Sequence, residues 1–441
     1  MMRLIDGAYF FECEDMVYLR NVNDGHDYIF NSIVSDILRF IKETPDCSEE
    51  MLCDHLKELY EVEDGEEFRQ DIHAFLAELM DSGLIGSEQS ASPSDDSVVG
   101  QVERLYEKNG MVYSAAFELT YRCSEKCIHC YVDDDCSAAA AQELTVEEYK
   151  DILHQLKEMG CVKLLLTGGE VCLRRDMADI AGYAVKLGFL VDIYTNGISM
   201  TDDQFGALCN MKLNSVSFSL YSGDPGVHDA ITQVPGSFEK TLKRAMMFKC
   251  AGVDTFIKTV VIRQNLDTLE ELFRLGERLH IDVTPATSIS NTHLGRSAQT
   301  FRLDTPKLRG QALQILKKFG YKPAPSAQRD LDGSVCKAGI TSLSIDPYGG
   351  VHPCLAFTAP IGNVRETPLE RIWQENEFLK SLRSFRFRDL TPECATCSYR
   401  NHCAVCLGDA YEESGGRFGP GCDSCHWAKS CYEALWNPAC D

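Results

Sequence analysis

Residues 113–131 read YSAAFELTYRCSEKCIHCY, in which a strand-like run ends and a loop with three cysteines follows. The cysteines are Cys123, Cys127 and Cys130, with the spacing C-x3-C-x2-C. A structural zinc ion or a fully ligated iron–sulfur cube takes four protein ligands. Three thiolates suit a metal site that keeps one position open for a reacting molecule. The loop follows a strand directly, and parallel α/β sheets place their active sites at that end of the strands.

Strand-like and helix-like segments alternate from about residue 113 to 320. Helical segments lie between the strands, and one of them, 145–160, begins with Thr145 and Glu148 in a capping box. Six such repeats predict an α/β fold with a parallel sheet, either open or curled into a partial (β/α)6 barrel. The expected strands are 113–120, 162–169, 190–197, 215–221, 255–262 and 281–289.

Different patterns flank this array. Residues 8–31 contain three short strand-like runs, and helical periodicity follows at 32–44, 48–60 and 66–83. The Ser/Asp-rich stretch at 86–100 has no periodicity and is typical of a linker. After about residue 321 the chain is rich in cysteine and glycine. We therefore expect a recognition unit at 1–86, a linker at 87–112, the barrel at 113–320 and a cysteine-rich domain at 321–441.

Charge and hydropathy exclude some classes of partner. The net charge of -24 argues against nucleic acid. Apolar runs are too short for a membrane span, and no export signal is visible, so we expect a cytoplasmic protein. The acids concentrate in residues 1–86, with 21 Asp/Glu against 6 Lys/Arg. That balance indicates either a solvated acidic surface or a basic partner.

The 21 cysteines are clustered, and ten of them lie from Cys336 onward. In a reducing compartment such clusters are more often metal ligands or catalysts than disulfides. The tail contains the stretches VCKAGITSLSIDPYGGVHPC (335–354), CATCSYRNHCAVC (394–406) and CDSCHWAKSC (422–431).

The three-cysteine loop resembles the signature of the radical S-adenosylmethionine (SAM) enzymes. The resemblance implies that Cys123, Cys127 and Cys130 bind a 4Fe-4S cluster whose open iron is chelated by the amino and carboxylate groups of SAM. Reductive cleavage of SAM would then give a 5′-deoxyadenosyl radical able to remove hydrogen from an unactivated C–H bond. The alternative is a zinc site that borrows a ligand such as His129.

Further stretches fit contacts with SAM. In TGGE, Gly168 and Gly169 would let the backbone approach the methionine end of SAM, and Glu170 would pair with its ammonium. The resemblance also implies that the backbone of Tyr131 meets adenine. The strand ends YTNG and SFSLYSG offer ribose or carboxylate contacts, namely Asn196, Ser219 and Ser222. Cys172 follows the TGGE loop closely and could touch the SAM pocket.

The tail resembles the SPASM extension of radical SAM enzymes, which holds two auxiliary iron–sulfur clusters. The resemblance implies an outer cluster on Cys394, Cys397, Cys403 and Cys425. It implies an inner cluster on Cys336, Cys354 and Cys406. Cys422 would complete the inner site, or one iron would stay open. The spacing C-x5-C-x2-C at 397–406 departs from the commoner C-x5-C-x3-C, and a zinc ribbon is the alternative.

Three strands followed by three helices suit a winged-helix DNA binder or a PqqD-like domain. The acidic balance disfavours DNA binding. The element order, with YIFNSIVSDIL and FLAELMDSGLI, resembles the PqqD-like domains that hold a leader peptide as an added strand. The candidate peptide contacts are Tyr28 and Phe30 on the third strand and Phe68, Ile72 and Phe75 on the last helix.

Together these features resemble the radical SAM/SPASM peptide maturases, and most closely the thioether-forming ones, which join a cysteine sulfur to a carbon of another residue. The resemblance implies a precursor peptide with a leader, which the acidic unit predicts to be basic, and an electron donor such as flavodoxin or ferredoxin. Alternatives within the family are carbon–carbon crosslinking, epimerisation and sulfatase maturation. From another class, the alternative is a zinc-dependent winged-helix regulator.

Overall fold

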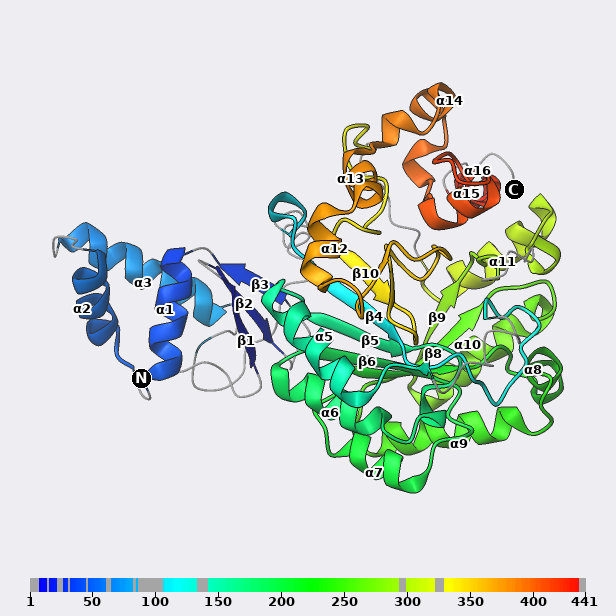
Figure 1. Ribbon diagram of the computed structural model, residues 1–441, viewed down its shortest axis with the longest axis horizontal. Coiled ribbons are helices and arrows are strands. Elements are labelled where there is room, and N and C mark those ends of the chain that lie inside the picture. Colours follow the sequence, from blue (N-terminus) through cyan, green and yellow to red (C-terminus); the bar gives the residue numbers. More distant parts are fainter. Residues whose placement is uncertain are drawn as a thin grey trace. The chain divides into compact units, whose positions relative to one another are not determined.

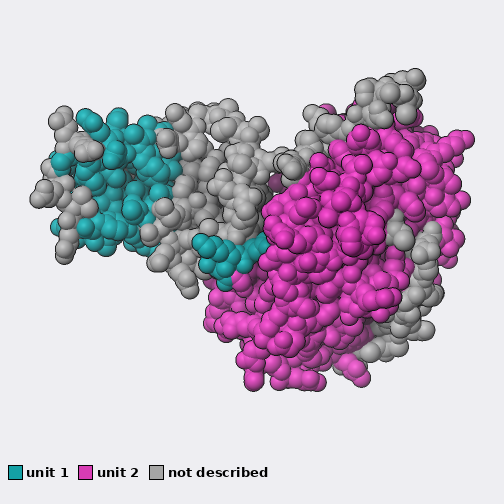
Figure 2. All heavy atoms as spheres, turned by 90° about the horizontal axis from the view of Figure 1, so that it is seen from above, with its two compact units in different colours: residues 1–109 teal, residues 110–441 magenta. Residues whose placement is uncertain are grey.

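The computed structural model describes residues 8–13, 16–21, 27–30, 32–44, 47–60, 65–81, 85, 106–132, 142–292, 299–321 and 329–435. The chain forms two compact units, residues 1–109 and residues 110–441 (Figure 2). In the described part, no helix has both the length and the apolar character needed to cross a membrane.

The first unit has the predicted order of three strands and three helices. Its antiparallel sheet has the order β1-β2-β3, with Cys13 opposite Met16 in a tight hairpin. Buried aliphatic residues such as Leu38, Leu52 and Leu76 join the three helices in one core. The elements are β1 (Ala8–Cys13), β2 (Met16–Asn21), β3 (Asp27–Phe30), α1 (Ser32–Glu43), α2 (Glu49–Tyr60) and α3 (Glu66–Asp81).

Six parallel strands of the second unit lie side by side in chain order, as the sequence predicts (Figure 1). The predicted α/β fold with a parallel sheet is thereby confirmed. These strands are β4 (Ser114–Glu118), β5 (Lys163–Thr167), β6 (Leu190–Thr195), β7 (Ser215–Ser219), β8 (Thr255–Val260) and β9 (Asp282–Ala286).

Helices connect these strands and cover one face of the sheet (Figure 1). The predicted capping box opens the first of them, since the Glu148 N–H donates to Thr145 Oγ1 at 3.3 Å and the Thr145 N–H donates to Glu148 Oε2 at 2.8 Å. The helices are α5 (Val146–Glu158), α6 (Met177–Leu187), α7 (Asp202–Cys209), α8 (Pro225–Thr232), α9 (Ser237–Cys250), α10 (Leu269–Leu279) and α11 (Pro306–Lys318).

The tail continues the sheet of the barrel instead of folding apart from it. Strand β10 pairs in parallel with β4, and β11 and β12 extend the edge in antiparallel fashion. The tail elements are β10 (Ser342–Ile345), β11 (Gly350–His352), β12 (Gly362–Asn363), α12 (Leu369–Glu375), α13 (Glu377–Ser384), α14 (Pro392–Thr396), α15 (Leu407–Glu413) and α16 (Cys422–Leu435). Short 3-10 turns lie at Val171–Leu173, Leu266–Thr268, Gln299–Phe301, Phe387–Asp389 and Arg400–His402.

Alternation along the strands separates an apolar face from a more polar one. Phe117, Leu166 and Ile193 occupy paired positions on neighbouring strands and are fully buried in the core. The next residue of β4, Glu118, is opposite Thr167 of β5 and therefore points to the other face. The carboxyl ends of the strands thus bring polar side chains to one face of the sheet.

Candidate active site

A cavity of about 630 Å³ lies at the carboxyl ends of the barrel strands. It brings together eight of the predicted site residues, namely Cys123, Cys127, Cys130, Tyr131, Gly168, Gly169, Asn196 and Ser219. Its wall also includes side chains that the sequence analysis did not single out, among them Tyr221, Lys258 and Thr284.

The three-cysteine loop is held by hydrogen bonds from its own backbone and from its surroundings. The Lys126 N–H donates to Thr232 O and the Ile128 N–H to Ile231 O, each at 3.0 Å, so the end of α8 fixes the loop. The Cys130 N–H donates to Cys127 O at 3.0 Å, which forms a turn between two of the cysteines. These contacts position the loop within the fold.

Burial governs the protonation of the loop thiols. It raises the pKa of Cys123 to about 12 and that of Cys127 well above its ordinary value. The Cys130 sulfur raises the pKa of both, so the three thiols lie within electrostatic range of one another. Thiolates are the form that binds metal, and a bound cation would supply the missing positive charge. The donor set therefore fits an iron–sulfur cluster.

The glycines of TGGE make room for the chain itself. A Cβ on Gly168 would lie 2.4 Å from Thr120 O, and one on Gly169 would lie 2.4 Å from Arg122 O. Gly168 also has a φ of 127°, in the region that favours glycine. Both glycines line the cavity, as expected, but their first effect is to let this turn pack directly on the chain segment that leads into the cysteine loop.

Glu170 is not brought to the cavity. Its side chain is fully buried and accepts hydrogen bonds from Thr195 Oγ1 at 2.6 Å, the Asn196 N–H at 2.7 Å and the Cys172 N–H at 3.0 Å. In this structure the carboxylate joins the ends of β5 and β6, and its predicted pairing with the ammonium of SAM stays a prediction. Cys172 is likewise buried, with its sulfur 3.5 Å from Thr195 Oγ1.

The other predicted polar contacts divide in the same way. Asn196 faces the loop, because its Nδ2 donates to Ser124 Oγ at 3.3 Å and lies 3.8 Å from Cys123 Sγ. Ser219 lines the cavity, whereas Ser222 is buried and donates to Thr268 Oγ1 at 2.7 Å. Ser222 thus fixes the turn after β7, and its predicted contact with a ligand stays a prediction.

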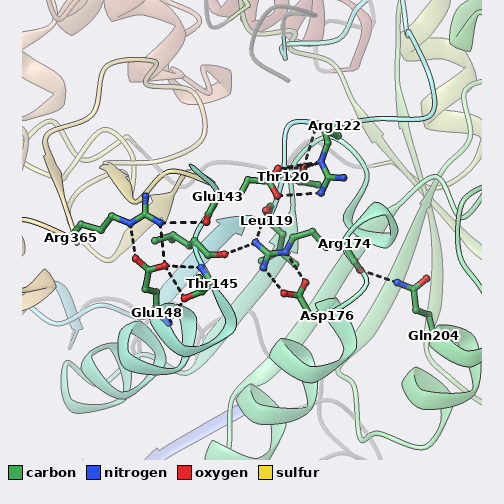
Figure 3. Close-up of polar contacts among 11 residues, drawn as sticks. Leu119, Thr120, Arg122, Glu143, Thr145, Glu148, Arg174, Asp176, Gln204 and Arg365 are labelled. Carbon is green, nitrogen blue, oxygen red and sulfur yellow. Dashed lines mark hydrogen bonds and ion pairs between the residues drawn. The ribbon is translucent and has the colours of Figure 1, made fainter. Parts of the chain in front are cut away.

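A layer of polar contacts holds the start of the cysteine loop and the turn after β5 (Figure 3). The buried Arg174 donates to Leu144 O at 2.8 Å and Leu119 O at 3.3 Å, and pairs with Asp176 at 2.7 Å. Thr120 and Arg122 both bond Glu143, which ties the loop to the segment before α5. These contacts position the ligands without touching the cavity.

The sequence analysis missed two polar residues of the cavity wall, Lys258 and Tyr221. Lys258 of β8 lies between Ser219 of β7 and Thr284 of β9 in the register of the sheet, and its ammonium group is 5.2 Å from the centre of the Tyr194 ring. Tyr221 places its hydroxyl 4.0 Å from Cys127 Sγ. A lysine inside the apolar run TFIKTVVI was the signal that could have identified the first of them.

His129 is a further feature of the wall. It is buried, its ring is edge-on to Tyr221 with the centroids 4.6 Å apart, and burial lowers its pKa to about 4. Its Nδ1 has no hydrogen-bond partner among the residues that the structure describes. A neutral imidazole of this kind could ligate a metal, as the zinc alternative supposes.

Among the described tail thiols, two sets contain sulfurs that raise one another's pKa. The pKa of Cys403 is raised to about 12 by burial and by Cys425, Cys394 and Cys397, so these four are neighbours. The pKa of Cys354 is likewise raised to about 12, by burial and by Cys336, and Cys406 is coupled to Cys354. No three ligand-type side chains in the described ranges are gathered tightly around one point, as a single metal ion requires.

The remaining cysteines differ in their burial. The side chain of Cys422 lies outside the described residues, as does that of Cys13. Cys47 and Cys53 are buried in the first unit, whereas Cys209 is half-buried and Cys250 is exposed.

The predicted peptide contacts on α3 are partly core residues. Ile72 is 8% exposed and belongs to the core of the first unit, so its predicted peptide contact is not supported. Phe68 and Phe75 are half-buried and pack against that core. Tyr28 and Phe30 lie on β3, at one edge of the three-stranded sheet, and their side chains are outside the described residues.

Three family models match the chain. Residues 117–276 match the radical SAM superfamily, residues 336–398 match SPASM, an iron-sulfur cluster-binding domain, and residues 17–85 match PqqD, coenzyme PQQ synthesis protein D.

Relatives and solved structures agree with these matches. The AdoMet-dependent heme synthase of Methanosarcina barkeri is 27% identical over 68% of this chain and 92% of its own. The PqqA peptide cyclase of Rhizobium meliloti is 26% identical over 64% of this chain and 78% of its own. The structure of Streptococcus suis SuiB bound to its precursor peptide SuiA has a TM-score of 0.66 at 16% identity, covering 96% of this chain and 100% of that one.

The barrel, the three-cysteine loop and the matched families define a radical SAM protein. More particularly, the chain is a radical SAM/SPASM protein with an N-terminal PqqD-like domain, as the sequence predicts. SAM and iron–sulfur clusters are therefore its cofactors, which confirms that prediction at the level of their identity.

Proposed function

We propose that the chain modifies a ribosomally made precursor peptide and joins a cysteine sulfur of that peptide to a carbon of another residue. The observation that carries the proposal is the presence, in one chain, of a PqqD-like unit and a radical SAM cavity with a thiol-rich tail. The relatives named PqqA peptide cyclase, and SuiB with its precursor peptide, support a peptide substrate.

In this proposal Cys123, Cys127 and Cys130 hold the SAM-binding 4Fe-4S cluster. When bound, the cluster and SAM supply the radical chemistry that removes hydrogen from an unreactive C–H bond. The protein orients the reactants and excludes water. Ser219 and Lys258 offer a hydroxyl and a cation on the far wall for the polar groups of a ligand.

The tail thiols suit two auxiliary clusters, the outer one on Cys394, Cys397, Cys403 and Cys425 and the inner one on Cys336, Cys354 and Cys406. A carbon–sulfur bond removes two hydrogens from the peptide. One leaves as a hydrogen atom bound for the nucleoside part of SAM, and the thiol hydrogen leaves as a proton. One electron then remains, and the tail clusters, once bound, would supply its acceptor, while an external donor such as flavodoxin or ferredoxin would supply the electron that each turnover needs at the start.

The leader is proposed to add a strand to the edge at β3, beside α3. An exposed strand edge offers unpaired N–H and C=O groups, which gives a peptide main-chain hydrogen bonds. The acidic excess of the unit predicts Lys/Arg in the leader. Leader affinity should then fall as salt rises from low to 0.5 M, and an affinity independent of salt would contradict a basic leader.

The deciding experiment uses anaerobically reconstituted, reduced enzyme with SAM and the cysteine-containing precursor peptide. The mass of the peptide is recorded before and after reaction, and again after thiol alkylation. A loss of two hydrogens per site with a cysteine that no longer alkylates supports the thioether. A Cys123→Ala variant, which lacks a proposed ligand of the first cluster, should leave the mass unchanged.

A carbon–carbon crosslink is the second candidate, because the name PqqA peptide cyclase describes a ring closure that need not involve sulfur. The same mass loss with every thiol still free to alkylate would select this reading over the thioether. An unchanged mass together with release of deoxyadenosine would indicate epimerisation or a peptide that is not the substrate.

A further inference from the structure

Helix α9 presents a groove at the surface that the proposed reaction does not use. The groove has a volume of about 440 Å³ and an apolar wall that includes Phe238, Leu242, Met246 and Met247. Met246 is 41% exposed, and no other large apolar side chain is exposed among the described ones of residues 110–441. Grouped apolar side chains at a surface often mark a protein contact, and methionine is enriched there. The groove is therefore a candidate docking surface.

The exposed side of α9 around this groove is basic. The helix carries four Lys/Arg against one acid, Glu239, which also lines the groove, in a chain that has 43 Lys/Arg against 67 Asp/Glu. Lys243 lines the groove, and Lys240 and Lys249 lie on the same helix. All three lysines are exposed, and none forms an ion pair with a described residue. Such cations steer an acidic partner into contact, so charge complementarity favours an acidic occupant.

Three ring side chains join the groove to the cysteine loop. Phe238, in the wall of the groove, has its ring centre 5.8 Å from that of His228. The His228 ring stacks on Tyr221 with the centroids 5.6 Å apart, and the Tyr221 hydroxyl is 4.0 Å from Cys127 Sγ. All three rings are buried. A partner seated in the groove is thus separated from a proposed cluster ligand by three buried side chains that pack in series.

Hydrogen bonds fix the start of α9 against the same loop. The Asp229 carboxylate, on α8, accepts from the Gly236 N–H at 2.5 Å and the Phe238 N–H at 3.0 Å. The Gln233 side chain donates to Lys126 O, inside the cysteine loop, at 2.5 Å. These bonds add to those between the loop backbone and the end of α8. The groove and the cysteine loop therefore belong to one connected part of the fold.

Charge alone does not single out this helix. α11 also carries four Lys/Arg and has no acid. None of the large apolar side chains of α11, which the structure describes throughout, is exposed. On α9 the basic charge occurs together with an apolar groove and with the series of rings that leads to Cys127.

We propose that the groove of α9 is where an acidic one-electron carrier protein docks to reduce the SAM-binding cluster. One electron passes from the reduced carrier to the cluster, and no bond forms or breaks. The inference rests on the proposed assignment of Cys123, Cys127 and Cys130 to that cluster, and it does not depend on which bond the enzyme makes in the peptide. Electron-transfer contacts are brief and small, which suits one groove with a few steering charges.

The test uses reconstituted full-length protein without peptide, and an acidic flavodoxin as the carrier. The docking variants are Lys240→Gln/Lys243→Gln and Met246→Glu. We would measure the Kd of oxidised flavodoxin at low and at high salt. We would also measure the rate at which reduced flavodoxin produces the SAM-sensitive electron paramagnetic resonance signal of the first cluster. The same rate with dithionite, a small reductant that needs no docking surface, reports on the cluster itself.

Each docking variant has a matched control. Lys307→Gln/Lys317→Gln on α11 makes the same change in net charge, and both lysines are exposed and form no ion pair with a described residue. Met51→Glu places a carboxylate at another exposed methionine, since Met51 of α2 is 45% exposed. Both controls should keep the Kd and the rates of the parent.

We expect Lys240→Gln/Lys243→Gln to raise the Kd about 5-fold to 20-fold at low salt, and the difference to shrink at high salt because exposed charges are screened. Met246→Glu should raise the Kd about 10-fold, because a carboxylate in the groove repels an acidic carrier and is desolvated by it. The rate with limiting reduced flavodoxin should fall in parallel, while the rate with dithionite stays that of the parent.

A parent-like Kd and flavodoxin rate in both docking variants would overturn the proposal, and so would an equal loss in the controls. A parent that dithionite reduces but flavodoxin does not bind would overturn it as well. Failure of the cluster assignment is told apart by Cys123→Ala, which should lose the SAM-sensitive signal and still bind flavodoxin with the Kd of the parent. If flavodoxin docks as expected and the peptide mass never changes, the thioether proposal fails and the docking surface stands.

Discussion

The Tyr131 hydroxyl donates a hydrogen bond to Glu118 Oε1 at 2.8 Å. Glu118 is 2% exposed at the carboxyl end of β4, and Tyr131 directly follows the last loop cysteine and lines the cavity. Tyr121 donates to the other carboxylate oxygen at 3.1 Å. One buried carboxylate therefore fixes the chain on both sides of the cysteine loop.

Burial raises the pKa of Glu118 to about 7, although the bond from Tyr131 favours the charged form. The folded protein therefore retains a proton there that the unfolded chain has lost above pH 4.5, so this group makes folding less favourable as the pH rises from about 5 to 8. Glu118→Gln should remove this contribution, so the free energy of unfolding should fall less between pH 5 and pH 8 than in the parent, by a few kcal/mol at most. Urea unfolding at pH 5 and pH 8 measures it.

Glu270→Gln is the control for this pH dependence. Glu270 is at the surface, and its bonds to Lys318 and Arg274 lower its pKa. Its contribution is present above its ordinary pKa and is lost on acidification, so its replacement should have the opposite sign, destabilising at pH 8 more than at pH 4. Equal pH profiles for Glu118→Gln and the parent would contradict the raised pKa.

Gly169→Ala should prevent normal assembly of the first cluster. The new methyl group would be 2.4 Å from Arg122 O and 2.7 Å from Tyr121 O, and backbone atoms at the base of the loop have nowhere to go. We expect a loss of roughly 1–3 kcal/mol in stability and a lower iron content. Iron analysis after reconstitution and urea unfolding measure both.

Gly310→Ala on α11 is the matched control, because nothing lies within 4 Å of its added methyl group. It should leave the iron content unchanged and stabilise the helix by up to about 1 kcal/mol. If Gly169→Ala keeps the iron content and the unfolding midpoint of the parent, the turn after β5 can shift to accommodate the methyl group, and the prediction is wrong.

Local pattern explains which parts of the fold could be predicted. The six barrel strands were found because alternating apolar positions such as Val216 and Phe218 are confined to short runs bounded by turns. The pairing of β10 with β4 was not foreseen, because its register, with Ser342 opposite Ser114, joins residues far apart in the chain. Periodicity shows that a strand exists and leaves its partner undefined.

The candidate site also has a part that the sequence predicts and a part that it does not. The three loop cysteines were found because their chemistry lies in one short segment. For Glu170 and Ser222 the sequence leaves two roles open, because a polar residue at a strand end serves equally well to face a ligand or to bond the neighbouring turn, and in this structure both make the bond to the turn.

Arg174→Lys should destabilise the second unit although the charge is kept. The guanidinium group of Arg174 is 6% exposed and bonds Leu119 O, Leu144 O and both oxygens of Asp176 (Figure 3). An ammonium group cannot make this fork of bonds, so buried acceptors lose their donors, at about 1–3 kcal/mol. Urea unfolding followed by circular dichroism measures the change.

Arg371→Lys gives the comparison on an exposed helix, where Arg371 pairs with Glu375 at 2.7 Å. That substitution should change stability by less than about 0.5 kcal/mol. Similar effects from the two substitutions would mean that the network around Arg174 contributes no more than a surface pair.

Lys258→Gln should weaken binding of the ligand that presents a carboxylate to the far wall. Lys258 is the one Lys or Arg among the described residues that line the cavity, and it lies between Ser219 and Thr284 in the sheet. A charged hydrogen bond of this kind contributes about 1.5–3 kcal/mol, so we expect the Kd for SAM, measured without peptide, to rise about 10-fold to 100-fold.

Lys163→Gln is the control, because Lys163 also lies 5.2 Å from a tyrosine ring centre, at the amino end of β5 and outside the cavity wall. An unchanged Kd for SAM with a raised KM for the peptide would assign the cation to the peptide instead, and no change in either would exclude Lys258 from ligand binding.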